Sequence, residues 1–344
     1  MKTYIGKIIK SAAGIAMCLM AVLAATSCSG QDEPEPTGPT PQIVFLFSPG
    51  GLGDMSYNDC ILRGVQQFKK DNPLVDLYIY SPTTIEEAER IFSDWLKRPG
   101  SDIPVLFTLA SSDYEPMVDD YIDLYALTPN KSLLLFESKK EYGQDRVCTF
   151  QISMFGASYL AGVMAAACNP SGESLVVLAN PTDAPIALAR EGFTAGLGHD
   201  CPVEYMADDW TGYISASLAY KKMAEWAPRY GFIFPVAGGS NAGIYRYTRE
   251  FPDSPFLAGM DTDQSGLSTK ITGSVLKHID RMVYEYLTEW LLKGEMPKAR
   301  LYGLDSGYAD FLLSPRFEAY RPEIEKSRTQ AIESEKDYNE KHRH

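Results

Sequence analysis

The sequence predicts an α/β protein with two lobes, each built around a parallel sheet that helices cover on both faces. Short apolar runs alternate with amphipathic stretches, a rhythm typical of parallel strands joined by crossover helices. The rhythm occurs in two series of similar size, which meet near residue 153. The length of 344 residues also fits two domains of about 150 residues each.

The first series begins with an apolar run that is expected to form a buried strand, because both of its faces are apolar. A Gly-rich loop and an amphipathic helix follow. Thr84 and Glu87 have the spacing of a capping box, which predicts the start of a helix. The predicted strands are residues 43–47, 77–80, 105–109, 133–136 and 147–152, and the predicted helices are residues 57–68, 85–95 and about 115–125.

The second series repeats the alternation. Its predicted strands are residues 175–178, about 203–205, 232–235 and 256–259, and its predicted helices are residues 157–167, 184–197, 215–226 and 241–250. Residues 271–292 predict one long helix, because the apolar residues from Val275 to Trp290 fall on a single stripe. Residues 321–344 are charged throughout and predict a solvated helix that frays at its end.

The N-terminus is predicted to be an export signal. Residues 1–27 combine a basic start, an apolar run and small residues at the end, a pattern typical of bacterial secretion. The ending Ala-Thr-Ser-Cys resembles a lipobox, so Cys28 is expected to be the first mature residue and to carry lipid on its thiol. The alternatives are an ordinary signal peptide with an incidental Cys, or a short transmembrane anchor. Residues 28–42 are polar, acidic and Pro-rich, as in a tether. The protein is therefore expected on a bacterial membrane, on the periplasmic side or the cell surface.

The charge balance excludes several classes of partner. The chain has 32 Lys plus Arg against 45 Asp plus Glu, a net charge of −13. The predicted signal holds three lysines and no acid, so the mature chain has 29 basic and 45 acidic residues, a net charge of −16. A field of that sign repels phosphate backbones and anionic lipid heads. We therefore expect no nucleic-acid partner. Only four His are present, two of them in the last three residues, so no metal site and no cofactor are expected.

The remaining cysteines are Cys60, Cys148, Cys168 and Cys201. Their spacing suggests neither a metal cluster nor a disulfide framework. Buried thiols are one interpretation. Export makes a disulfide possible as the other, with Cys168–Cys201 the first pair to test.

Ligands of open parallel sheets bind at the carboxyl ends of strands. The loops expected there are residues 48–58, 110–114, 237–243 and 259–266. In the first loop, Asp54 and Asn58 flank the ring of Tyr57 and could hold a planar, hydroxylated ligand. The alternative is a capped helix start, with Asp54 or Ser56 as the N-cap. The Gly run lacks the pattern of a dinucleotide fingerprint or a P-loop.

The other loops offer similar choices. Residues 235–241 could contact a ligand through backbone N–H groups, or form a tight turn capped by Asn241. Asp261 follows a buried strand and is placed to accept hydrogen bonds from neighbouring hydroxyls. Lys277, taken alone, is expected on the surface of the long helix.

Four segments carry a resemblance to a known family. They read GGLGDMSYND at 50–59, SYLAGV at 158–163, VAGGSNAG at 236–243, and GMDTDQ at 259–264 followed by SVLKHID at 274–280. Together they resemble the motifs of the basic membrane protein family of exported, lipidated solute-binding proteins, which includes purine nucleoside receptors. The resemblance implies a monomeric type I periplasmic-binding-protein fold with a ligand cleft between two lobes and a hinge crossed three times. It also implies a purine nucleoside ligand and delivery to an ABC permease.

The lobes are then expected to interleave. Residues 43–150 with about 266–304 would form the first lobe, and residues 151–265 with about 305–344 the second. The resemblance implies that the ligand-binding residues are Asp54, Tyr57, Asn58, Asp113, Trp210, Tyr213, Gly239, Asp261 and Lys277.

Within this set the resemblance implies distinct roles. Asp113 lies near the base, and Asp261 with Lys277 reaches the ribose hydroxyls. Trp210 or Tyr213 supplies a second stacking ring beside Tyr57, which stands where the family has Phe. Met55 also replaces a family Lys, so the identity of the ligand stays open.

Three functions are weighed. The favoured one is a binding protein that closes on a small polar ligand for ABC import. The second is a surface receptor or sensor with the same cleft and another partner. The third is a nucleoside or glycoside hydrolase that uses Asp54 and Asp261 as paired carboxylates. Neither His199 nor His278 falls in a predicted site loop, and no catalytic residue is assigned.

Overall fold

The computed structural model describes residues 39–170, 172–297 and 300–342. The predicted signal peptide, Cys28 and most of the predicted tether lie outside the described residues. From Thr40 onward the chain forms one compact unit. Within the described part of the chain, no helix has both the length and the apolar character needed to cross a membrane.

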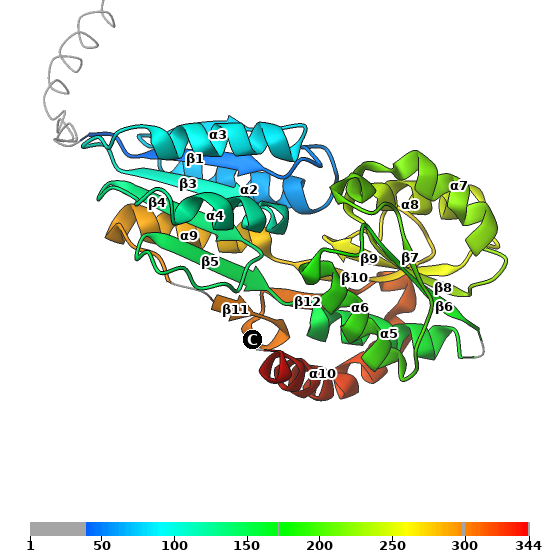
Figure 1. The fold of residues 1–344 in the computed structure, drawn as a ribbon. Coiled ribbons are helices and arrows are strands. Elements are labelled where there is room, and N and C mark those ends of the chain that lie inside the picture. The colour runs from blue at the N-terminus through cyan, green and yellow to red at the C-terminus, as the bar shows by residue number, and fades with distance from the viewer. Residues whose placement is uncertain (1–38, 171, 298–299, 343–344) are drawn as a thin grey trace, which may run out of the picture. The chain divides into compact units, whose positions relative to one another are not determined.

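The described strands form two six-stranded sheets (Figure 1). The first, in spatial order, contains β11 (Arg300–Tyr302), β5 (Val147–Ile152), β4 (Lys131–Phe136), β3 (Val105–Ala110), β1 (Gln42–Phe47) and β2 (Asp76–Tyr80). The second contains β12 (Ala309–Leu313), β10 (Ile271–Lys277), β9 (Phe256–Asp261), β8 (Phe232–Val236), β6 (Ser174–Leu178) and β7 (Val203–Tyr205). All neighbouring strands pair in parallel except β10 and β12, which are antiparallel.

Helices cover both faces of each sheet. Those of the first sheet are α2 (Tyr57–Asp71), α3 (Ile85–Lys97), α4 (Glu115–Ile122) and α9 (Ile279–Lys293). Phe45 and Phe47 pack with α2 and α9, whereas their neighbour Leu46 packs with α3 and α4. This alternation follows from the two-residue period of a strand. Thr84 caps α3 as predicted, because its side chain accepts a hydrogen bond from Glu87 N at 3.2 Å.

The second sheet is covered in the same way. Its helices are α5 (Phe155–Cys168), α6 (Ala184–Leu197), α7 (Ala216–Trp226), α8 (Asn241–Glu250) and α10 (Arg321–Lys341). Val176 packs with α5 and α6, and Val177 packs with α7 and α8. Helices α5 and α6 approach closely because a glycine stands at the contact: a Cβ on Gly162 would lie 2.1 Å from Phe193 O.

The chain crosses between the sheets three times. It passes from β5 to α5, from β10 to α9, and from β11 to β12. The α/β fold with two mainly parallel sheets is therefore confirmed, and the three crossings agree with the expected hinge.

Two sequence-based assignments are wrong. Residues 271–292 do not form one helix, because β10 ends at Lys277 and α9 begins at Ile279, with only His278 between them. No Gly or Pro marks this break, and the apolar stripe runs across it. As β10 pairs with β9, residues 271–277 belong to the second sheet and not to the first lobe. The short strands β11 and β12 were not predicted.

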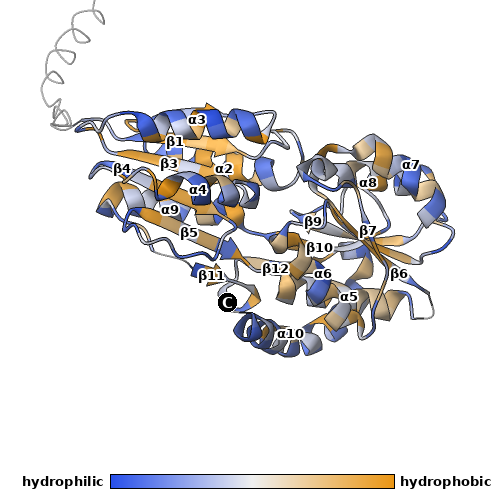
Figure 2. Cartoon of the chain, viewed as in Figure 1, coloured by the Kyte–Doolittle hydropathy of each residue, from blue (hydrophilic) through white to orange (hydrophobic). Residues whose placement is uncertain are grey.

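The C-terminal helix is only partly the solvated element that its charge predicts. Most of α10 is hydrophilic (Figure 2), yet Ile324, Ala331 and Glu335 are buried. The helix packs along α5. The proposed Cys168–Cys201 disulfide is absent, since both residues carry thiols. Cys60 and Cys148 are buried.

Candidate functional site

A pocket with about 790 Å³ of empty space lies between the loops that follow the strands of the two sheets. The first sheet contributes loops after β1, β3 and β4, and the second contributes loops after β6, β8 and β9. All nine sequence-predicted site residues line this one pocket: Asp54, Tyr57, Asn58, Asp113, Trp210, Tyr213, Gly239, Asp261 and Lys277. Their contact with a ligand stays a prediction.

The loop before α2 is fixed by its own side chains. The Asp54 carboxylate accepts hydrogen bonds from the backbone N–H of Ser56 and Asn58, each at 2.9 Å, and of Asp59 at 3.2 Å. Asp54 therefore satisfies donors at the start of α2, as the capping alternative proposes, and also lines the pocket. Ser56 stands at the N-cap but makes no side-chain cap. Burial raises the pKa of Asp54, and these three N–H groups oppose the rise.

Asn58 positions the same loop. Its Nδ2 donates to Gly51 O at 2.9 Å and to Ser48 Oγ at 2.8 Å. Gly51 and Gly53 have φ of 75° and 89°, a backbone conformation that glycine adopts without strain. Met55 shares this conformation with φ of 53°. The Gly-rich sequence thus permits a tight loop whose side chains face the pocket.

At one end of the pocket, an acid and a lysine end neighbouring strands. Asp261 ends β9 and is 8% exposed, and Lys277 ends β10 beside it. Lys277 Nζ lies 3.1 Å from Glu137 Oε1, in an ion pair whose side chains are 7% and 4% exposed. Burial raises the pKa of both carboxyls, and the ammonium opposes this rise. Lys277 is therefore a buried strand residue of the pocket, not a surface residue of a helix.

Backbone strain marks this end. Glu137 and Asp261 have φ of 58° and 67°, the left-handed region that few residues other than Gly adopt. Glu137 directly follows β4 of the first sheet, and Asp261 is the last residue of β9 in the second sheet. Strain of this kind costs of order 1–3 kcal/mol per residue and concentrates at binding sites. The packing of the strand ends therefore holds the two carboxylates that flank Lys277 in a backbone conformation that these residues do not favour by themselves.

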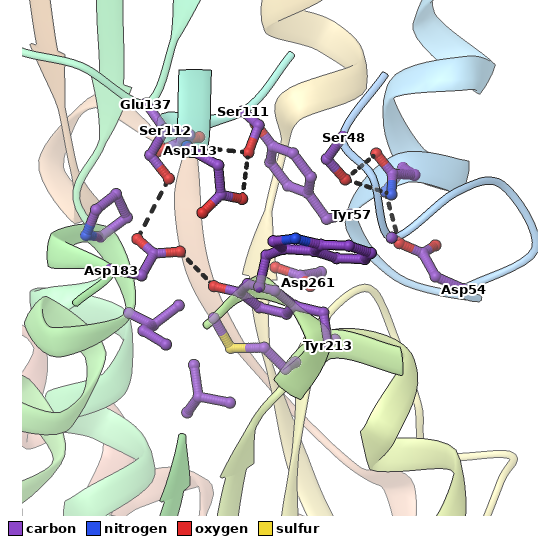
Figure 3. A pocket seen from close by; sticks show the side chains of 18 of the residues that line it. Ser48, Asp54, Tyr57, Ser111, Ser112, Asp113, Glu137, Asp183, Tyr213 and Asp261 are labelled. Atoms are coloured by element: carbon purple, nitrogen blue, oxygen red, sulfur yellow. Dashed lines mark hydrogen bonds between the residues drawn. The ribbon is translucent and has the colours of Figure 1, made fainter. Parts of the chain in front are cut away.

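Aromatic rings line the middle of the pocket. Tyr57 comes from the first residue of α2, and Trp210 and Tyr213 come from the 3₁₀ helix η2 (Trp210–Ile214). Figure 3 shows Tyr57 and Tyr213 entering the pocket from different elements. Lys277 Nζ lies 5.2 Å from the Tyr57 ring centroid. The buried Tyr57 hydroxyl has no hydrogen-bond partner among the described residues.

Two further acids, from loops of different sheets, come together near Glu137. Asp113 lies in the 3₁₀ helix η1 (Ser112–Tyr114), and Asp183 stands directly before α6. Ser112 Oγ donates to Asp183 Oδ1 at 3.3 Å, and the Tyr213 hydroxyl donates to Asp183 Oδ2. Burial and the nearby Asp183 raise the pKa of Asp113 to about 6.

Hydrogen bonds also join the lobes around the pocket. The Ser56 hydroxyl donates to Asp261, and Gln264 Nε2 donates to Met55 O at 2.9 Å. With the Ser112–Asp183 bond, they bring loops of both sheets into contact around the pocket.

Sequence reasoning missed Glu137 and Asp183. Both follow parallel strands, β4 and β6, so the rule that identified the other loops applies to them equally. Neither stands in a Gly-rich segment, and attention to Gly-rich loops therefore passed them over. Among the described residues, no group of three or more His, Cys, Asp and Glu is arranged to hold a metal ion.

Two α/β lobes, three crossings and a polar pocket between the strand ends define a two-lobed solute-binding protein. Residues 42–341 match the family described as Bmp, ABC transporter substrate-binding protein PnrA-like. The chain belongs to this family.

Relatives agree with this assignment. Basic membrane protein C from Borreliella burgdorferi is 26% identical over 172 residues, which are 46% of each chain. The chain thus spans about half the length of the curated relatives it matches. That relative carries the family name implied by the sequence motifs.

Solved structures share the fold. An ABC transporter solute-binding protein from Aeropyrum pernix K1 is 17% identical with a TM-score of 0.66, covering 86% of both chains. A transcriptional activator of the comK gene from Bacillus halodurans is 14% identical with a TM-score of 0.62, over 85% of this chain and 97% of that one. A carbohydrate transporter solute binding protein from Agrobacterium radiobacter, in complex with D-arabinose, is 16% identical with a TM-score of 0.59, over 83% of this chain and 99% of that one. At these identities the likeness shows the fold alone.

Proposed function

We propose that this substrate-binding protein captures a purine nucleoside in the pocket between its lobes. The observation that carries the proposal is the set of side chains that one pocket brings together. Asp261 and Lys277 supply a carboxylate and an ammonium, three aromatic residues supply rings, and Asp113 and Asp183 supply further carboxylates. A nucleoside presents a partner for each: ribose hydroxyls, a flat ring, and a polar base edge.

Each part has a physical role. The Asp261 carboxylate accepts hydrogen bonds from vicinal hydroxyls, and the Lys277 ammonium donates to a hydroxyl oxygen. Tyr57 and Trp210 stack on the base, a contact worth about 1–3 kcal/mol per ring. Backbone N–H groups near Gly239 complete the wall. Five acids and one lysine line the pocket, which favours an uncharged ligand over a phosphate.

The export signal, the lipid on Cys28 and the tether belong to the same proposal. The protein acts as a monomer outside the cytoplasmic membrane, held there by lipid, and hands its ligand to an ABC permease. Mass spectrometry of the mature N-terminal peptide tests the anchor. An unmodified Cys28 in the protein isolated from membranes would contradict it.

The ligand is tested by native mass spectrometry of the purified protein, followed by calorimetry with a panel of nucleosides and free pentoses. We expect an intact nucleoside to bind with a dissociation constant in the micromolar range or below. Binding of pentoses alone would overturn the nucleoside assignment and leave the family unchanged. Release of free base and ribose from added nucleoside would instead establish a hydrolase.

A further inference from the structure

The acids at the base end of the pocket present acceptors only. Ser111 Oγ donates to Asp113 Oδ2 at 2.8 Å, and the hydroxyls of Ser112 and Tyr213 donate to Asp183. Figure 3 shows these three hydrogen bonds and both carboxylates beside the same space. These three hydroxyl donors are thus already engaged, whereas the Tyr57 hydroxyl in the same pocket has no partner among the described residues.

Among the described residues, no cation forms an ion pair with either acid, and the charge of Lys277 acts on Asp183 only in opposing the rise in its pKa. The Lys277 ammonium pairs with Glu137, and no Lys or Arg of the described chain lies within ion-pair distance of Asp113 or Asp183. Asp113 Oδ1 receives no hydrogen bond from the described residues. Asp113 is half-buried, so a ligand that covers this oxygen without donating to it would leave a charged acceptor both desolvated and unpaired, which is costly.

The ligand edge at this end must therefore supply N–H donors. A guanine-type edge has two adjacent donors, the ring N1–H and the exocyclic amino group, which match the two oxygens of a carboxylate as a guanidinium does. An adenine-type edge also has an exocyclic amino donor, but its N1 is unprotonated, and the N1 lone pair would face a carboxylate lone pair. A hypoxanthine edge keeps N1–H and lacks the amino group.

We propose that Asp113 and Asp183 make the pocket selective for a guanine-type base, whose N–H donors satisfy one carboxylate from each lobe. This inference rests on the proposed nucleoside function and adds the base to it. Because the two acids come from different lobes, the same donors link the lobes across the pocket and relieve the repulsion between like charges. Base selection and closure are then one event.

Calorimetry of the full exported chain with guanosine, inosine and adenosine tests the proposal. We expect guanosine to bind at least about tenfold more tightly than adenosine, with inosine between them, because a site built to accept hydrogen bonds from two adjacent donors rejects an analogue that has an acceptor in place of one of them. Equal or tighter binding of adenosine would overturn the base assignment while leaving the nucleoside function intact. If no nucleoside binds, the proposed function itself fails.

Two variants locate the effect. Asp183→Asn and Asp113→Asn keep shape and one acceptor but replace the other oxygen by a donor. Each is expected to weaken guanosine by about tenfold and to change adenosine by less than about threefold, since the new amide can donate to adenine N1. Equal losses for both nucleosides would contradict the proposal.

Matched controls remove the same charge elsewhere. Asp94→Asn on α3 and Asp253→Asn after α8 change exposed acids outside the pocket. Both controls are expected to bind all three nucleosides as the unchanged protein does. If either control lost its preference for guanosine over adenosine, the cause would be the change in net charge, and base selection by Asp113 and Asp183 would be overturned.

Discussion

Two carboxylates in this protein, the buried Glu335 and the half-buried Asp113, differ in how many hydrogen bonds they accept. Glu335 of α10 is 3% exposed and accepts hydrogen bonds from Ser153 Oγ at 2.7 Å, Gly156 N at 3.0 Å and Leu304 N at 2.8 Å. Asp113 in the pocket accepts one side-chain hydrogen bond and lies near another acid. A carboxylate whose two oxygens both accept hydrogen bonds from the protein stabilises the structure. A carboxylate with an oxygen left unpaired can accept hydrogen bonds from a ligand.

The backbone makes room for Glu335 at two crossings between the sheets. Ser153 follows β5 and Leu304 follows β11, so the carboxylate joins the first and third crossings. A Cβ on Gly303 would lie 2.3 Å from Glu335 Oε2, and one on Gly156 would lie 3.0 Å from it. The last helix thus holds together segments that are about half the chain apart in sequence.

The comparison is tested most strongly by Glu335→Ala. This change leaves two buried N–H groups without acceptors, each costing about 1–3 kcal/mol, so we expect a loss of about 3 kcal/mol in the free energy of unfolding. Urea denaturation measures it. Glu333→Ala, an exposed site on the same helix, is the control and should change stability by less than about 0.5 kcal/mol. Equal effects of the two variants would show that the Glu335 contacts do not stabilise the crossings.

Gly303→Ala is expected to have the next largest effect. The added methyl group must displace the carboxylate or the loop, and overpacking of this kind costs about 1–3 kcal/mol. Gly143→Ala serves as control, because a Cβ there meets nothing within 4 Å. Thermal unfolding of both variants gives the comparison. An unchanged midpoint for Gly303→Ala would mean that the Glu335 site is loosely packed.

The sequence allowed prediction of the fold wherever a strand is apolar on both faces and a helix has one apolar stripe. The prediction failed at His278, where a single residue separates β10 from α9 and the apolar spacing continues without a break. The role of Glu335 could not be predicted, because one acid in a charged tail looks solvated until α10 is placed against α5. Its partner Ser153 lies 182 residues earlier in the chain.

The candidate site also contains residues that the sequence predicts and residues that it does not. Residues next to glycines, such as Asp54 and Gly239, were found from their loops. Lys277 was singled out through its family motif but placed on the wrong element. Glu137 and Asp183 line the pocket together with residues from the other sheet. This arrangement depends on how the two sheets bring their strand ends together, which the sequence does not show.

Asp261→Asn should separate binding from stability. The variant keeps the shape and an acceptor for the Ser56 hydroxyl, and Asn tolerates a positive φ. We expect nucleoside affinity to fall by about tenfold, because the charged acceptor for the ribose hydroxyls is lost, with unfolding free energy changed by less than about 1 kcal/mol. Calorimetry and urea denaturation of one preparation measure both. Unchanged affinity would place the hydroxyl-binding end of the pocket elsewhere.

The smallest expected effect is a dependence of guanosine affinity on pH. The donors of the ligand bind the ionised form of Asp113, whose pKa is raised to about 6, so a proton must leave before or during binding. Affinity should therefore rise by about fourfold between about pH 5.5 and 7.5 and level off above that range, as the ionised fraction does for a pKa near 6. The pKa of Asp113 is raised by its burial and by the charges of Asp183 and Asp209, and the hydrogen bond from Ser111 opposes this rise.

In Asp113→Asn the rise in affinity with pH should be smaller, because of these two acids only Asp183 still titrates. In Glu335→Gln the rise should stay unchanged, since that carboxyl does not line the pocket. A pH dependence that follows Glu335 instead of Asp113 would reverse the division between structural and ligand-binding carboxylates.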